Sequence, residues 1–419
     1  MRAAWIVAIV LLSPGVAVAQ STQSPQTPQS QEKPAGSTFT AGWRDGFFIQ
    51  NDNGDFRLQI GLFLQADNRF ALEDSSETLT DTFSIRRFRP YLRGRVAQRF
   101  EFFVNPDFAG GVLTVYDAYL DTRFSNAFRL RVGKGKVPVG HERAQAAATQ
   151  LLFERGFPTA ISPNRDVGVL VLGDVRGGIV SYQAGVVNGT ADGASGDTDT
   201  NDGKDAVGRL IVRPFVKQAK SPLAGVSLAF SASAGKQSGT TPLPAFRTST
   251  MQQTFFAYTG ATADGTRTRY SPFASYYNKA FGGFVEYVRS EMPIRKGAIV
   301  EDIAHQAWQI AGSYVLTGEA ASDAGIKPKA NFDFGGGHWG AFQVAARYHA
   351  LSVDEAAIRL GFAVAGASRE AKAWTAGLNW YWNPYIRYTF NFERVVFDGD
   401  ANGPRKPENI LALRTQLYF

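Results

Sequence analysis

From Phe56 to the last residue, apolar and polar side chains alternate in segments of about ten residues. Segments 56–67 and 409–419 show the pattern most clearly, because one set of alternate positions is almost entirely Leu, Ile and Phe. Gly, Asn, Asp and Pro separate the segments. Since successive side chains of a β-strand point to opposite faces, this pattern predicts many strands that are apolar on one face.

Soluble antiparallel sheets also alternate, so two further features are needed to choose a membrane barrel. The chain starts like a secretory signal, with Arg2, an apolar run over 3–12 and the small-residue exit Ala17-Val18-Ala19. It also contains 32 Phe, 15 Tyr and 7 Trp, as the aromatic girdles of a membrane barrel require. We therefore predict an all-β, transmembrane antiparallel β-barrel in the outer membrane of a Gram-negative bacterium.

Three regions follow from these patterns. Residues 1–19 are predicted to be a signal peptide that is cleaved after Ala19. Residues 20–37 are almost wholly Gln, Ser, Thr and Pro, so 20–55 is predicted to be a disordered periplasmic leader and lead-in segment. Residues 56–419 are predicted to form the barrel, which closes by the pairing of segment 56–68 with segment 409–419.

The alternating segments indicate about 16 strands, an even number. They are 56–68, 82–96, 100–108, 112–122, 128–135, 166–174, 177–188, 206–216, 224–235, 266–278, 281–290, 304–318, 338–351, 372–382, 385–397 and 409–419. With this assignment long outer loops alternate with short inner turns, and 291–303 is counted among the long loops. Two connections break the rule, a short outer one at 109–111 and a long inner one at 319–337. Fourteen or eighteen strands therefore remain open.

The predicted strand 82–96 carries a column of arginines on one face. They are Arg87, Arg89, Arg93 and Arg95. Turned toward lipid, each would cost about 2–4 kcal/mol near the middle of the bilayer. We therefore expect them to face the interior and to line a water-filled lumen, where arginines select anions. The alternative is a plugged barrel, in which they pair with inward carboxylates such as Glu101 and Asp107.

Composition excludes several other classes. The chain has no cysteine and a formal charge of +7, and 31 of its 44 basic residues are arginine. Its four histidines show no spacing of a hydrolytic triad or a metal site, so we expect no enzymatic activity, no cofactor and no metal. The predicted export signal argues against a nucleic-acid partner despite the basic charge.

A series of short runs resembles the phosphate-selective porin O and P family from about residue 57 to residue 419. The runs are IRRFRP (85–90), NPDFAGG (105–111), YDAYLD (116–121), VGKGKVPVGHE (132–142), FERG (153–156), VVNGT (186–190), YVLTGE (314–319), GAFQVAARY (340–348) and GLNWYWNPYIRY (377–388). The resemblance implies a homotrimer of sixteen-stranded channels, each with a ladder of arginines. It also implies a constriction loop after the fifth strand, which would be 136–165 in this chain.

Taken together, the column and the resemblance predict an anion pathway. Its expected residues are Arg57, Arg87, Arg89, Arg93, Arg95, Asp121, Lys136, Arg143, Arg155 and Arg165. The expected partners are small anions, such as phosphate or other oxyanions, and outer-membrane lipid. The strongly phosphate-selective members present a lysine midway along the loop, whereas 144–156 has none, so strong selection of phosphate is not expected. The alternatives are a general diffusion porin with little selectivity and a barrel with a structural or enzymatic role.

Overall fold

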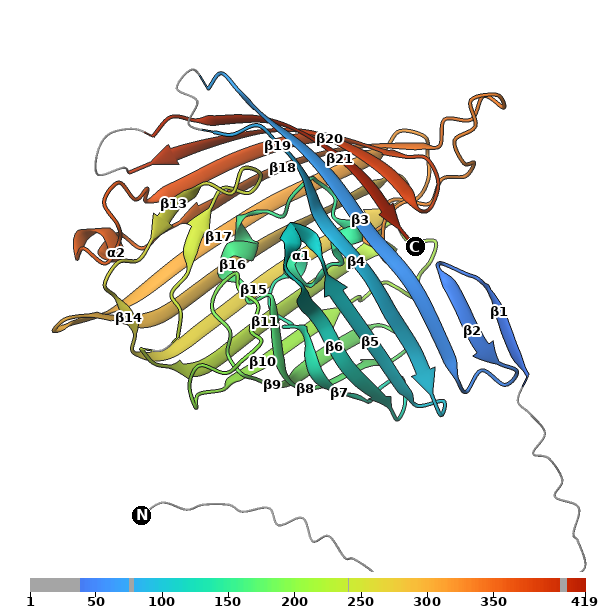
Figure 1. Ribbon diagram of the computed structural model, residues 1–419, viewed down its shortest axis with the longest axis horizontal. Helices are drawn as coiled ribbons and strands as arrows, with labels where there is room; N and C mark the ends of the chain where they lie inside the picture. The colour runs from blue at the N-terminus through green and yellow to red at the C-terminus, as the bar shows by residue number, and fades with distance from the viewer. Residues whose placement is uncertain (1–37, 75–78, 240, 400–404) are drawn as a thin grey trace, which may run out of the picture. The chain divides into compact units, whose positions relative to one another are not determined.

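The computed structural model describes residues 38–74, 79–239, 241–399 and 405–419. Sixteen antiparallel strands of this part of the chain close into a barrel (Figure 1). They are β3 (Arg57–Leu72), β4 (Thr82–Val96), β5 (Phe100–Asp107), β6 (Thr114–Arg123), β7 (Arg129–Lys136), β8 (Arg165–Val175), β9 (Val180–Val187), β10 (Asp205–Val212), β11 (Val226–Gln237), β15 (Gly265–Asn278), β16 (Phe281–Lys296), β17 (Ile299–Val315), β18 (Ala341–Ser352), β19 (Glu370–Tyr381), β20 (Ile386–Asp398) and β21 (Glu408–Tyr418). The predicted sixteen-stranded barrel is confirmed.

The barrel closes where its last strand meets its first. Strand β21 pairs with β3 from Tyr418 opposite Phe63 to Asn409 opposite Leu72. This is the closure that the sequence predicts, and it leaves no free edge between these strands.

No helix among the described residues has both the length and the apolar character needed to cross a membrane.

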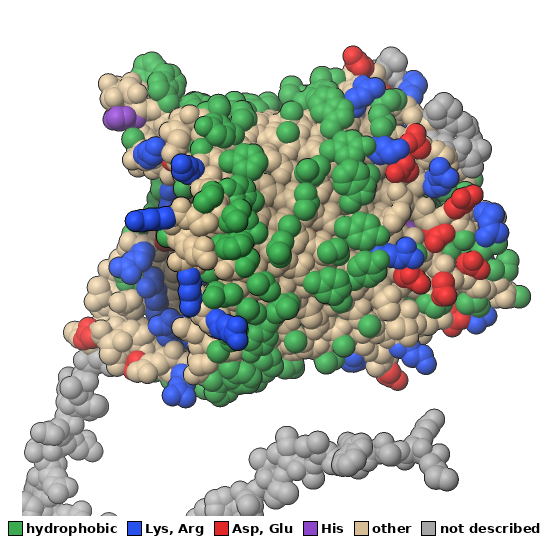
Figure 2. Space-filling model, turned by 180° about the vertical axis from the view of Figure 1, so that it is seen from behind, with side chains coloured by type: hydrophobic (Ala, Val, Ile, Leu, Met, Phe, Trp, Pro, Cys, Tyr) green, Lys and Arg blue, Asp and Glu red, His purple; other side chains and the backbone are tan. Residues whose placement is uncertain are grey.

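The two faces of the wall differ in the way that the alternation predicts. Leu58, Ile60 and Leu92 point outward and are exposed, whereas Gln59 and Arg87 point inward and are buried. Figure 2 shows that hydrophobic side chains cover the middle of the wall and that charged side chains gather toward its two ends. This uncharged, hydrophobic middle band matches the hydrocarbon layer of a bilayer.

Connections at one end of the barrel, the turn end, are mostly short, as at 97–99 and 279–280. At the other end, the loop end, the longest connections are 137–164 and the stretch between β11 and β15. The short loop-end connection beside Ala109–Gly111 is present, as is the long turn-end connection between β17 and β18. These two exceptions therefore do not reflect a wrong strand count.

The predicted long loop 291–303 is wrong. Strand β16 continues to Lys296 and strand β17 begins at Ile299, so two residues connect them. Met292, Ile294 and Ile303 are buried in the largest apolar cluster of the described residues, which explains why this charged, proline-containing stretch stays in the sheet.

The cluster that buries them fills part of the loop end. It is built by the loop-end hairpin of β12 (Ala245–Arg247) and β13 (Thr254–Ala257), by the short helix α2 (Glu355–Arg359) and by the inward-facing side of the wall. Phe246, Phe256 and Phe362 are fully buried there. A two-residue strand, β14 (Thr262–Ala263), pairs with β16 beside it.

Two strands precede the barrel, although the sequence indicates none before Phe56. Strands β1 (Phe39–Trp43) and β2 (Phe47–Asn51) form a hairpin, and β2 pairs with β3 over 57–60. This stretch of β3 lies beyond the end of β21, so β2 satisfies hydrogen-bonding groups that would otherwise remain unpaired. The hairpin occupies the predicted lead-in segment. The predicted signal peptide and residues 20–37 lie outside the described residues.

The C-terminal residue takes part in closing the barrel. Phe419 exchanges two backbone hydrogen bonds with Leu62, at 3.0 and 3.1 Å, and its carbonyl accepts a hydrogen bond of 2.6 Å from the Tyr91 hydroxyl. Its ring lies 4.9 Å from that of Trp43, measured between centroids.

Deleting Phe419 removes these contacts from the closing seam. We expect the amount of heat-modifiable barrel in outer membranes to fall severalfold, as measured on gels of unboiled and boiled samples. Phe334→Ala, at an exposed aromatic residue of the connection between β17 and β18, is the matched control and should have little effect. Unchanged levels of the deletion variant would contradict this role.

Candidate functional site

A bulge in the wall brings two consecutive arginines toward the lumen. Gln65 of β3 pairs with Arg87 of β4, and the next residue, Ala66, pairs with Ile85, so Arg86 is the extra residue. A bulge interrupts the alternation, and both guanidinium groups approach Glu154. Strict alternation would place Arg86 toward lipid, which is why the sequence analysis missed it.

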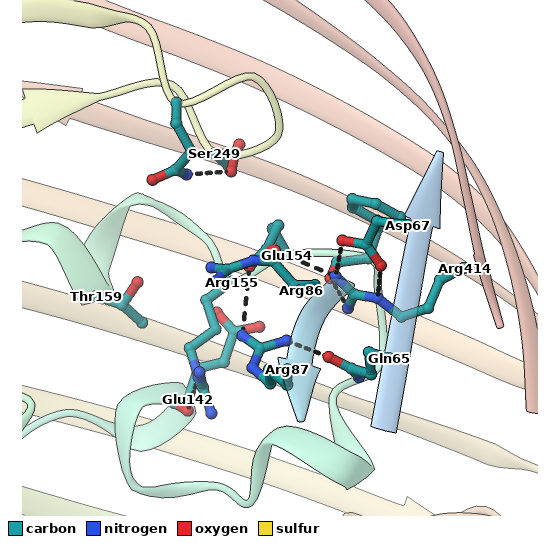
Figure 3. A network of polar contacts seen from close by, with 12 residues as sticks. Gln65, Asp67, Arg86, Arg87, Glu142, Glu154, Arg155, Thr159, Ser249 and Arg414 are labelled. Atoms are coloured by element: carbon teal, nitrogen blue, oxygen red, sulfur yellow. Dashed lines mark hydrogen bonds and ion pairs between the residues drawn. The ribbon is translucent and has the colours of Figure 1, made fainter. Parts of the chain in front are cut away.

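Glu154 is the centre of a buried network of ion pairs (Figure 3). Its Oε1 lies 2.7 Å from Nε of Arg86 and 3.2 Å from Nη2 of Arg414 on β21, and its Oε2 lies 3.7 Å from Nη2 of Arg87. Arg414 also binds Asp67 of β3, with an Nε to Oδ1 distance of 2.6 Å. Burial opposes ionisation of Glu154, but the guanidinium groups of Arg86, Arg87 and Arg414 outweigh it and hold its pKa well below the usual range.

The network fixes an inward-folded loop, residues 137–164, to the wall. This inward loop contains helix α1 (His141–Ala144) and two short 3₁₀ helices, Ala147–Thr149 and Phe157–Ile161. Val139 and Ile161 are fully buried, and Figure 1 shows α1 inside the barrel. The loop occupies the position that the resemblance predicts for the constriction loop.

A second anchor holds the inward loop to the opposite wall. The Glu142 carboxylate accepts hydrogen bonds from Gly156 N at 2.7 Å, from Gln309 Nε2 of β17 at 3.1 Å and from Arg347 Nη1 of β18 at 3.3 Å. Arg155 donates to the carbonyl oxygens of Glu142 and Gln145 at 3.0 and 2.9 Å. The loop therefore crosses the lumen between two fixed points.

Two cavities remain on either side of the inward loop, each of about 490 Å³. The turn-side cavity and the loop-side cavity share three lining residues, namely Arg89, Ala147 and Arg165. These three residues therefore lie where the two cavities adjoin. Arg89 pairs with Asp107 and Arg165 pairs with Asp117, so both guanidinium groups are held in position.

Each of the ten predicted pathway residues lines one of these cavities. Those of the turn-side cavity are Arg57, Arg89, Arg93, Arg95, Asp121, Lys136 and Arg165. Those of the loop-side cavity are Arg87, Arg89, Arg143, Arg155 and Arg165.

The environment of the arginine column is not uniformly solvated, contrary to the expectation from sequence. Arg87 and Arg89 are only 4% exposed. Arg89 pairs with Asp107 at 2.7 Å, and Arg95 pairs with Glu101 at 3.0 Å. These are the two carboxylates that the plugged-barrel alternative names, because they lie on the neighbouring strand β5. These arginines therefore do form ion pairs with inward carboxylates, but the two cavities remain open beside the pairs.

The charges that line the two cavities are nevertheless mostly positive. Twelve are cations: Arg57, Arg86, Arg87, Arg89, Arg93, Arg95, Arg131, Lys136, Arg143, Arg155, Arg165 and Arg247. Five are carboxylates: Glu101, Asp117, Asp121, Glu154 and Asp192. Within the described residues, Arg57 and Arg93 form no ion pair, so their charges are not neutralised locally.

A model of one protein family matches almost the whole barrel, and its description is phosphate-selective porin O and P, over residues 58–419. A search of curated proteins finds no match.

Solved structures of outer-membrane channels share the fold at low sequence identity. The channel DcaP of Acinetobacter baumannii has a TM-score of 0.56 at 13% identity, over 89% of this chain and 99% of its own. The trimer form of OmpT of Vibrio cholerae has a TM-score of 0.53 at 12% identity, over 87% and 99%. An anion-selective porin from Comamonas acidovorans has a TM-score of 0.53 at 11% identity, over 87% and 100%.

Replacing Glu154 by Gln tests the anchor of the inward loop. The amide keeps the shape but removes the carboxylate that the guanidinium groups of Arg69, Arg86, Arg87 and Arg414 share, so we expect a loss of about 3–5 kcal/mol of stability. Glu291→Gln is the matched control, since Glu291 pairs with Arg289 at the surface, and such pairs contribute about 0–1 kcal/mol. The temperature at which the barrel unfolds in detergent, followed by circular dichroism, should fall much further for Glu154→Gln. Equal shifts would contradict the anchor.

Proposed function

The chain belongs to the phosphate-selective porin O and P family, and from this premise we propose that its lumen is a water-filled pore that favours small anions. An outer-membrane porin channel follows from the family and the fold. The main support for a preference for anions is that the charged residues lining the two cavities are twelve cations and only five carboxylates.

The proposed path starts at the loop end and passes Arg247, Arg143 and Arg155 in the loop-side cavity. It then passes Arg89 and Arg165, where the two cavities adjoin, and enters the turn-side cavity. A pore potential that favours anions by about 1.4 kcal/mol would give tenfold enrichment. Since several lining cations have no carboxylate partner, such a potential survives the local pairing.

Strong selection of phosphate is not part of the proposal. The inward loop has no lysine between Ala144 and Gly156, and its arginines are committed to the protein. Arg155 donates to two backbone carbonyls, and Arg143 donates to the carbonyl of Thr159. Few N–H groups of the loop are therefore free to chelate a compact oxyanion. A general diffusion pore with little selectivity is the second candidate, and the paired carboxylates beside Arg89 and Arg95 favour it.

We also propose a homotrimer, whose subunits contact one another through the low part of the wall, where the strands are shortest. Strands β5, β7, β9 and β10 have eight residues each, against 16 and 17 in β16 and β17. Tilted by about 40°, eight residues span about 20 Å, less than the apolar band of about 25 Å. A neighbouring subunit would shield this low wall from lipid. The trimer form of the similar OmpT supports this arrangement.

The family and the similar structures point to a channel rather than an enzyme. We propose that residues 1–19 direct export and are then removed, in accord with the outer-membrane assignment.

The double variant Arg57→Glu and Arg93→Glu tests the sign of the pore potential. It replaces two unpaired positive charges by two negative ones, while the buried network around Glu154 stays intact. In a planar bilayer with a potassium chloride gradient, we expect the reversal potential to shift toward cation preference.

Arg359→Glu is the control, because Arg359 is exposed on α2 and lines neither cavity. It should leave the reversal potential nearly unchanged. If the double variant and the control behaved alike, the turn-side charges would not set selectivity.

A further inference from the structure

Aromatic rings form a continuous arc along the wall of the turn-side cavity. The rings belong to Tyr119, Phe103, Tyr91, Tyr418 and Phe63, and all five line the cavity. Successive centroids in this order are 5.7, 5.7, 6.1 and 5.7 Å apart. These spacings are those of ring pairs in contact, so the arc is one aromatic surface.

The arc is built from inward positions of five neighbouring strands. Phe103 of β5 lies opposite Tyr119 of β6, and Phe63 of β3 lies opposite Tyr418 of β21. Tyr91 of β4 fills the gap between them by lying over Gly61. A Cβ on Gly61 would stand 2.1 Å from Cζ of Tyr91, so only glycine allows this ring position.

Arginines lie over the rings, and they differ in how they are paired. Arg131 lies 3.7 Å from the Tyr119 centroid and binds Asp121 at 2.7 Å. Arg93 lies 5.6 Å from the Tyr91 centroid, and within the described residues it forms no ion pair or hydrogen bond. Arg93 is thus a guanidinium group beside an aromatic surface with its donors free.

Arg93 also stands where two cavities meet. Together with Tyr91 and Tyr418, it lines both the turn-side cavity and a neighbouring cavity of about 240 Å³. A solute that enters or leaves at the turn end therefore has this guanidinium group and these two rings within reach.

We infer that the aromatic arc and Arg93 form a binding site for carboxylates that carry an aromatic ring. A guanidinium fork binds a carboxylate with two parallel hydrogen bonds, and the rings offer a face to an apolar body. The cavity volume lies within the usual range of about 300–1,000 Å³ for small-molecule sites, which combine aromatic linings with a few charged groups. The inference rests on the proposed anion pore and narrows the class of anion that it would take.

Inorganic phosphate does not explain the arc, because it has no apolar surface to place against five rings. A general water-filled passage does not explain it either, since aromatic surface along a lumen is poorly hydrated. The loop-side cavity provides the contrast. Its cations are as numerous, but its aromatic lining consists of Tyr116 and Phe157.

Benzoate and acetate separate the contribution of the ring from that of the charge. In single-channel recordings of the full-length protein, we expect benzoate to block chloride current at one-tenth or less of the acetate concentration needed for equal block. Phosphate should block no better than acetate. Phe103→Leu and, separately, Tyr119→Leu should reduce the difference between benzoate and acetate to less than threefold, while acetate block stays the same.

Phe390→Leu is the matched control, because Phe390 faces outward on β20 and its loss should leave benzoate block unchanged. Equal block of the wild type by benzoate and acetate would overturn the inference, as would an equal loss of benzoate block in the control. If neither ring variant assembles, calorimetric titration of the wild-type protein in detergent with the same two anions decides. A wild-type reversal potential that shows cation preference would instead overturn the proposed anion pore itself.

Discussion

The buried network around Glu154 determines where a solute can pass through this barrel. A sixteen-stranded barrel is wide enough to hold a water-filled channel, so its permeability depends on what lies inside it. Glu154 holds the inward loop to Arg69 of β3, Arg86 of β4 and Arg414 of β21, and Glu142 holds it to the opposite wall. The space that remains lies along the arginine-bearing wall, and the apolar cluster at the loop end confines it to the same side.

This arrangement explains why so many lumen arginines can be buried without losing their charge. Removing a guanidinium group from water is costly unless carboxylates and hydrogen bonds compensate. Arg89, Arg95, Arg131 and Arg165 each have a carboxylate partner, which fixes the position of the side chain. Compensation is incomplete over the two cavities as a whole, so an excess of positive charge remains along them, and the proposed preference for anions rests on this excess. The same rigid guanidinium groups and rings would give the pore chemical preference as well as charge preference.

The alternation of apolar and polar residues predicted most of the fold, because every strand of a closed barrel has one face toward the outside and one face toward the lumen. This rule placed Arg57, Arg93 and Arg95 correctly on the lumen side, and it found the closing pair of strands. It failed where local structure departs from strict alternation or where distant residues meet. The bulge that turns Arg86 inward has no clear signal in the sequence, and the Asp67 to Arg414 pair joins residues 347 positions apart. The strands through 291–303 depend on burial by another loop, which local composition does not report.

The most direct test of the account is a single-channel recording of the wild-type protein in a planar bilayer with a gradient of potassium chloride. The account predicts discrete conductance steps and a reversal potential of the sign that chloride sets, with a preference that declines as salt screens the lumen charges over about 8 Å at physiological ionic strength. A reversal potential of the sign that potassium sets would contradict the central claim, and so would the absence of conductance from correctly folded barrels.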